Sequence, residues 1–102
     1  MRLGRIAWSG GEPPDEATVR ERLVADGFTP FRWSDAPGAT YEPHAHPHDE
    51  SLWVLDGAID FLIEGEVHRL GPGDRLQLPA HTVHAAEAGP QGATYLIGQR
   101  LQ

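Results

Sequence analysis

Apolar residues from position 28 onward fall into short runs that are separated by glycine and proline. The runs lie at residues 28–33, 50–57, 58–70, 75–79 and 93–101. In the third run Ile59, Phe61 and Ile63 alternate with other residues, so they share one face of an extended chain. Several short strands with Gly and Pro turns between them predict an all-β fold, either a sandwich or a barrel.

Two dipeptides in this region have the chemistry of tight hairpin turns. Asp56-Gly57 closes the run at 50–57, and Glu64-Gly65 interrupts the run at 58–70. Glycine favours such turns because it adopts positive φ at little steric cost. We therefore expect one strand to end at Asp56-Gly57 and another at Glu64-Gly65.

The helix signal of this chain lies before the first strand. Two prolines and two acidic residues suit a helix start, and Gly27 suits the position after the helix end. Val19, Leu23 and Val24 give one narrow apolar stripe, which predicts a helix over roughly 15–26 on the outside of the β-structure.

The length of 102 residues leaves room for one domain. We expect a single domain over residues 1–102, with an N-terminal extension and helix at 1–27 and a barrel core at about 31–100. A core this small gains stability from a bound metal, from a partner subunit or from both.

Charge and composition exclude several classes of function. The formal net charge is −7, there is no Lys, and the eight Arg are scattered along the chain, so no basic patch is available for nucleic acid. The absence of Cys excludes disulfides and thiolate metal sites. Apolar runs are too short for a membrane span, and the N-terminus lacks the apolar stretch of a signal peptide, so we expect a cytoplasmic protein.

All six histidines fall between positions 44 and 84. His44 and His46 are two residues apart and point to one side of an extended chain, and a bend over the next three residues brings Glu50 back toward them. His84 follows a turn in the second half of the chain. Three imidazoles and one carboxylate suit one divalent ion, Zn, Fe, Mn, Ni or Co, and leave coordination positions open. The alternative is an exposed histidine tract that binds metal only adventitiously.

The wider spacing resembles the two motifs of the cupin superfamily. The first motif, Gly-x5-His-x-His-x3-Glu-x6-Gly, is matched at every position by Gly38, His44, His46, Glu50 and Gly57. The second motif is matched by three residues, Gly73, Pro79 and His84. The resemblance covers roughly residues 31–100 and implies a cupin-type antiparallel β-barrel, a jelly roll, with His44, His46, Glu50 and His84 as metal ligands.

Two positions depart from the second motif, namely His81 in place of Gly and Ala88 in place of Asn. Neither position is a ligand in the family. From the turn before His84, His81 could reach a bound substrate as a catalytic acid or base, and the alternative is an exposed turn histidine without a role. His48 is expected to be a solvated loop residue because the Pro47 bend directs it away, and the alternative is a role as a further metal ligand or as an acid/base group.

The resemblance implies several functions because cupins host many reactions. The first hypothesis is a small metalloenzyme of the dioxygenase, isomerase or decarboxylase type that acts on a small polar molecule. The alternative is a non-catalytic, metal-dependent module that binds or senses a small molecule, and a purely structural metal site is a third reading. We also expect a homodimer, with Trp53 on the outer face of the barrel at the centre of the interface or under the helix.

Overall fold

The computed structural model describes residues 1–101, with side chains for residues 1–100, so the last residue of the expected domain lies outside the described part. One helix and seven strands follow one another along the chain. They are β1 (Gly4–Ile6), α1 (Glu16–Ala25), β2 (Thr29–Asp35), β3 (Thr40–His44), β4 (His48–Ile63), β5 (Glu66–Leu70), β6 (Arg75–Leu78) and β7 (His84–Leu101). The predicted all-β fold with one short N-terminal helix is confirmed.

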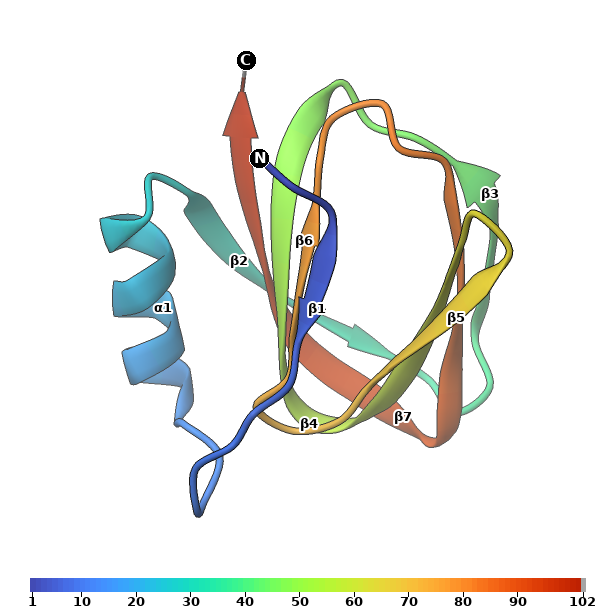
Figure 1. Cartoon of the computed structure of the whole chain (residues 1–102). Coiled ribbons are helices and arrows are strands. Elements are labelled where there is room, and N and C mark those ends of the chain that lie inside the picture. The colour runs from blue at the N-terminus through green and yellow to red at the C-terminus, as the bar shows by residue number, and fades with distance from the viewer. Residues whose placement is uncertain (102) are drawn as a thin grey trace.

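Every strand pairing is antiparallel, and the two longest strands hold the barrel together (Figure 1). The sheet order is β1-β6-β4-β7-β2, while β3 adds to β7 and β5 adds to β4. Both β4 and β7 bend, so the first part of β7 pairs with β3 and its last part pairs with β2. The jelly-roll barrel therefore has one interior. Strands β2 and β3 both border this interior, and they pair with different parts of β7.

The predicted end of a strand at Asp56-Gly57 is wrong, because β4 continues through this dipeptide to Ile63. The register between β4 and β7 shifts between Val54 and Asp56 and again between Gly57 and Ile59, as it does at β-bulges. Gly57 has a φ of 75°, and a Cβ atom there would lie 2.2 Å from the carbonyl oxygen of Gly92. Glycine tolerates positive φ, which suggested a hairpin here. In the structure this tolerance instead permits a β-bulge, at which the strand bends.

The second predicted turn is confirmed at Glu64-Gly65, between β4 and β5. Both residues have positive φ, 53° and 79°, and Ile63 pairs with Glu66 across the turn. These dihedral angles match the two-residue hairpin turn that fits the twist of paired strands.

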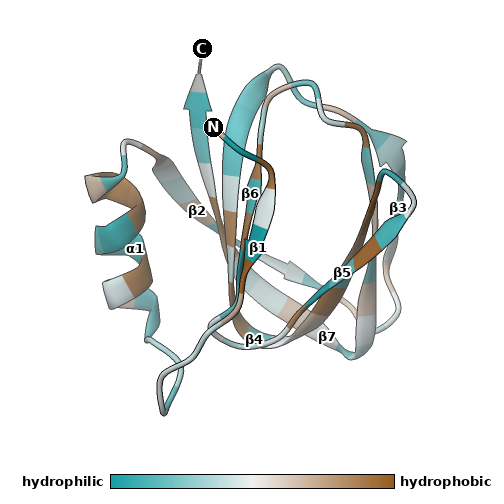
Figure 2. Cartoon of the chain, in the orientation of Figure 1, coloured by the Kyte–Doolittle hydropathy of each residue, from teal (hydrophilic) through white to brown (hydrophobic). Residues whose placement is uncertain are grey.

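The barrel interior is filled by the alternating apolar residues of β4, β6 and β7. Leu76 and Leu78 face this core, whereas Arg75 on the same strand points to the opposite face of the sheet. Apolar colour lies along the lower bend of β4 and also on β5 and α1, whereas the upper end of β4 and the C-terminal end of β7 are hydrophilic (Figure 2). Polar side chains are thus available at the upper end, where the chain passes from β3 to β4.

Helix α1 lies beside the barrel (Figure 1), and a second apolar cluster fills the space between it and the outer face of the sheet. Asp15 caps the helix by accepting a hydrogen bond from the N–H of Thr18 at 2.9 Å. Val19 and Leu23 of the helix are fully buried in this cluster, where they meet Trp53 of β4.

Trp53 is 8% exposed, so its expected place at the centre of a subunit interface is wrong, and the second expectation, burial under the helix, is confirmed. Its Nε1 donates to the carbonyl oxygen of Gly73 at 2.9 Å, and the Arg75 guanidinium lies 4.8 Å from the ring centroid. Arg75 in turn donates to Asp26 at the end of the helix at 2.9 Å. The outer face of β4 around Trp53 is therefore covered by α1 and is not free to pack against another chain.

Candidate metal centre

His44 and His84 meet because the end of β3 and the start of β7 pair directly at these two residues. Their ring centroids are 4.4 Å apart. Between the pair Tyr41–Ala86 and the pair His44–His84, β3 advances three residues while β7 advances two, which is the count of a β-bulge. The bulge reverses the alternation, so both Tyr41 and His44 face the barrel interior.

Backbone carbonyl groups fix the orientation of these two rings. His44 Nδ1 lies 2.6 Å from the carbonyl oxygen of Glu42, and His84 Nδ1 lies 2.9 Å from that of Thr82. A carbonyl oxygen only accepts hydrogen bonds, so Nδ1 carries the proton in both neutral rings and Nε2 keeps its lone pair. Burial also lowers the pKa of His84, which favours the neutral, ligating form.

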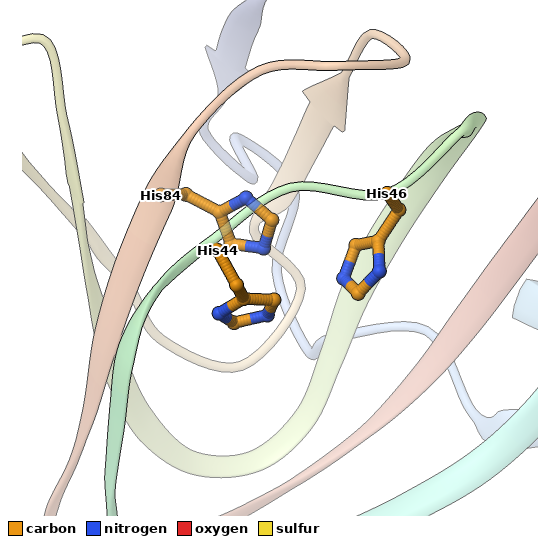
Figure 3. A group of neighbouring side chains, drawn as sticks. All are labelled: His44, His46 and His84. Atoms are coloured by element: carbon orange, nitrogen blue, oxygen red, sulfur yellow. The ribbon is translucent and has the colours of Figure 1, made fainter.

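His46 completes the trio from the loop between β3 and β4. Figure 3 shows the three rings turned toward a common space, with His44 and His84 side by side and His46 across from them. The N–H of His81 donates to the carbonyl oxygen of His46 at 2.7 Å, which ties this loop to the turn before β7. One ring nitrogen from each of the three histidines lies within 4.8 Å of the others.

Glu50 approaches the histidines from β4. The Oε1 atom of Glu50 lies 3.9 Å from Nε2 of His46, and Glu50 is only 5% exposed. Gln99, its cross-strand neighbour on β7, points an amide nitrogen at Oε2 from 3.4 Å. The four predicted ligand residues thus lie at the same end of the barrel.

His48 does not behave as the solvated loop residue that the sequence suggested. Its side chain is 13% exposed, and its Nε2 lies 3.0 Å from Oε2 of Glu50. The ring also stacks on His46 with centroids 5.4 Å apart. Strand β4 already begins at His48, so it shares the inward parity of Glu50. That shared parity was readable in the sequence, but the expected bend at Pro47 outweighed it.

His81 occupies an exposed turn between β6 and β7. Its φ is 66°, a left-handed conformation in which the family motif has Gly. It borders a second hollow with Pro43, Leu62 and Glu64. His84 lines both this hollow and the histidine cavity, but His81 does not line the histidine cavity. The structure brings the backbone of His81, and not its ring, into the support of His46.

A cavity of about 230 Å³ opens beside the three histidines. Its remaining walls come mainly from aromatic and aliphatic side chains of four strands, β2, β3, β4 and β7. The main contributors are Phe31, Trp33, Tyr41, Phe61, Tyr95 and Ile97. A small organic molecule would therefore meet polar ligating groups at one end and apolar surface along the rest of the cavity.

A buried hydrogen-bonded network lies behind the aromatic wall. Asp35, which is 9% exposed, accepts hydrogen bonds from the hydroxyl of Tyr41, from Trp33 Nε1 at 2.9 Å and from the hydroxyl of Tyr95 at 2.6 Å. Burial and the bond to Asp35 raise the pKa of Tyr95 far above its usual range and also raise the pKa of Tyr41. Sequence reasoning missed Asp35, although the alternation of residues 31, 33 and 35 on one strand was a usable signal.

The donor set suits a divalent metal ion. Imidazole and carboxylate are the ligand types that such ions take in proteins without thiolates, and the Nε2 lone pairs are held ready by the Nδ1 hydrogen bonds. The ligating atoms also form two overlapping groups, His44–His46–His84 and His46–His48–Glu50. The residues present therefore could hold one ion at the mouth of the cavity.

A small antiparallel barrel with a histidine-lined cavity at one end is the architecture of a cupin. The model of the cupin domain family matches residues 31–96, and the chain belongs to this family. The resemblance drawn from the two sequence motifs is thereby confirmed.

Two similar proteins illustrate the range of this family. The chain is 31% identical over 101 residues to the dimethylsulfoniopropionate lyase DddW of Ruegeria pomeroyi, covering 91% of this chain and 66% of that protein. It is 29% identical over 87 residues to the oxalate decarboxylase OxdC of Bacillus subtilis, covering 80% of this chain and 23% of OxdC. The chain thus spans about two thirds of one relative and about a quarter of the other.

Solved structures share the fold at lower sequence identity. A cupin superfamily protein from Desulfitobacterium hafniense superimposes with a TM-score of 0.66 at 19% identity, over 99% of this chain and 79% of that one.

Within the described residues, no helix is long and apolar enough to cross a membrane.

Proposed function

We propose that this chain is a metal-dependent cupin enzyme that acts on a small organic molecule carrying a carboxylate. In this proposal His44, His46, Glu50 and His84 hold one divalent ion, either Zn, Fe, Mn, Ni or Co. The observation that carries it is the convergence of three imidazole nitrogens within 4.8 Å beside a cavity of about 230 Å³.

The two enzyme relatives support the substrate class. Dimethylsulfoniopropionate and oxalate, after which the lyase DddW and the decarboxylase OxdC are named, are both small carboxylates. The chain presents no Lys, and no Arg is among the described residues that line the cavity, so a carboxylate would have to bind at the metal end. A bound divalent ion would supply Lewis-acid stabilisation of negative charge on a substrate oxygen.

The chain's own residues have separable tasks in this scheme. The carbonyl groups of Glu42 and Thr82 keep two imidazoles in the ligating tautomer, and His48 and Gln99 orient the Glu50 carboxylate. The apolar wall excludes water and packs against the carbon skeleton of the substrate.

The test combines metal analysis with a substrate screen. The protein should retain about one divalent ion per chain after purification without added metal, and it should consume at least one small carboxylate from a panel that includes oxalate and dimethylsulfoniopropionate. Protein that neither retains nor takes up Zn, Fe, Mn, Ni or Co would overturn the proposal.

A binding or sensing module is the second candidate. The hydroxyl of Tyr41, the nearest phenol on β3, already donates to Asp35 and accepts from Trp33 Nε1 at 3.0 Å. No free phenol is therefore ready to exchange protons with a ligand. Metal-dependent ligand binding without turnover of any panel compound would favour this candidate.

The catalytic role of His81 stays a prediction. His81→Gly should keep the metal and lower turnover or ligand affinity if the ring reaches the substrate. Since Gly adopts positive φ without strain, the same variant should not lose stability by more than about 1 kcal/mol. Unchanged turnover would leave His81 as a turn residue that supports His46 through its backbone.

We also propose that the chain forms a homodimer and works in the cytoplasm. The outer face of β4 around Trp53 is covered by α1, so the interface of this dimer has to lie elsewhere. Strand β2 is at the end of the sheet order, where an unpaired edge favours association. Light scattering that gives a monomer mass at micromolar concentration would overturn the dimer.

A further inference from the structure

The wall of the cavity away from the histidines is a patch of aromatic rings on β2, β3 and β7. Phe31 pairs with Ile97, and Trp33 pairs with Tyr95, in the register of β2 and β7. Because residues directly opposite in an antiparallel pair lie on the same face, all four side chains point into the cavity. Tyr41 adds a fifth side chain from β3, so rings from three separate strands surround this end.

The polar tips of three of these rings point to one buried carboxylate. Trp33, Tyr41 and Tyr95 all donate to Asp35, which lies behind the rings and does not itself line the cavity. With their polar atoms directed at Asp35, the rings present carbon surface to the cavity. The faces of aromatic rings carry partial negative charge.

Asp35 has no cationic partner within the described part of the chain, since its hydrogen bonds come from one indole and two phenols. Buried carboxylates are more often paired with Arg or Lys. The Arg75 guanidinium, by contrast, is engaged with Asp26 on the other face of the sheet. The charge of Asp35 is therefore compensated only by dipoles, and its field extends through a low-dielectric wall into the cavity.

We propose that this aromatic end, defined by Phe31, Trp33, Tyr41 and Tyr95 in front of Asp35, is a binding subsite for an onium group, a methylated ammonium or sulfonium cation. Aromatic faces attract such cations and require no hydrogen bond from them. The buried carboxylate adds attraction that a neutral group of the same shape does not receive. No Arg or Lys lines this end to oppose the cation.

The subsite deepens the proposed function, because it lies in the cavity that the metal centre opens into. A substrate that places a carboxylate at the histidines and an onium group against the aromatic rings would match both ends. The onium subsite is made by residues other than the four proposed ligands, so it is testable by itself.

The experiment compares choline with 3,3-dimethylbutan-1-ol, which replaces the quaternary nitrogen by carbon and keeps the shape and the hydroxyl group. Binding to the full chain is followed by calorimetry and by the fluorescence of Trp33 and its two fellow tryptophans. We expect choline to bind at least about tenfold more tightly than the alcohol. Equal affinities, or tighter binding of the alcohol, would overturn the proposal.

Two variants and one control locate the effect. Asp35→Asn and Trp33→Leu should each remove most of the preference for choline, while Asp60→Asn should keep it. Asp60 is a carboxylate on the outer surface, where it pairs with Arg69 at 2.8 Å, so the control removes the same charge elsewhere. Trp33 is 46% exposed, so Trp33→Leu remains informative even where Asp35→Asn does not fold. A choline preference that survives Trp33→Leu would overturn the proposal.

Metal content measured on the same samples separates the two proposals. A metal-loaded protein without a choline preference contradicts only the onium subsite. A protein with the preference but without metal uptake contradicts only the proposed metalloenzyme.

Discussion

The two ends of the cavity are built in opposite ways. At the histidine end, the polar groups come from strand ends and from the loop after β3, and their donor atoms face the open space. At the aromatic end, the side chains come from the middle of strands, and their polar atoms turn away from the cavity toward Asp35. The first end therefore offers coordination, and the second offers shape and a diffuse negative potential.

This difference teaches how the barrel divides its tasks. Strand ends and loops place the rings of His44, His46 and His84 close together, and backbone carbonyl groups hold two of those rings. Strand pairing brings His44 beside His84, and the loop after β3 adds His46 to them. The middle of the sheet, by contrast, builds a continuous wall.

Acidification should produce the largest separation between the two ends. Ordinary imidazoles have a pKa near 6.5, so between about pH 7.5 and pH 4.5 the metal affinity should fall by about 1000-fold or more. Ligands bind metal as neutral imidazoles, so the stabilisation by metal is present at neutral pH and lost as pH falls. Calorimetric titration with Zn²⁺ at both pH values measures the change, and undiminished affinity at the lower pH would contradict an imidazole site.

The pKa of His84 gives the metal-free protein a pH dependence of the same sign. Burial lowers this pKa in the folded chain, so the unfolded chain binds the proton more readily. The contribution of His84 to the free energy of unfolding is therefore present above its ordinary pKa and declines as pH falls below it. Urea unfolding of chelator-treated protein at neutral and acidic pH checks the sign against the variant His84→Gln.

Removal of one proposed ligand should affect only the histidine end. Glu50→Ala and His46→Ala should each lower metal affinity by about 100-fold or more, and the metal should no longer raise the melting temperature. Choline binding at the aromatic end should persist. His68→Ala, in a histidine of β5 outside the cavity lining, is the matched control. Wild-type affinity in either ligand variant would refute the ligand assignment.

A smaller loss of metal affinity is expected from His48→Phe. The ring size is nearly kept, but Oε2 of Glu50 loses its 3.0 Å hydrogen bond with His48. Such supporting contacts typically contribute about 10- to 100-fold in metal affinity. If the Co²⁺ absorption spectrum of the variant instead shows the loss of one nitrogen ligand, His48 is itself a ligand. The ion would then be bound by the group His46–His48–Glu50.

Tyr95→Phe should leave the histidine end unchanged and weaken the aromatic end. The variant removes one of three donors to Asp35, so the free energy of unfolding should decrease by about 1–3 kcal/mol, with metal content unaltered. Ser34→Ala, which removes an exposed hydroxyl that shares a hydrogen bond with Thr94, should change stability by about 0.5 kcal/mol or less. Equal small effects in both variants would show that the Asp35 network contributes little.

The sequence by itself determined the family, the all-β class, the helix near the N-terminus and the set of residues from which a metal site can be built. These features depend on local rules. The spacing of His44, His46 and Glu50 is short, and the turn at Glu64-Gly65 needs only positive φ.

Only the tertiary structure decided the rest, because contacts between distant strands override local preference. Gly57 permits a hairpin and a bulge equally, and the close approach of Gly92 selected the bulge. Trp53 had outward parity, but packing of α1 over that face buried it. Asp35 lies 60 residues from Tyr95 in the sequence, and the pairing of β2 with β7 brought the two together. An aromatic wall with a carboxylate behind it exists only after that pairing, since no single strand contains it.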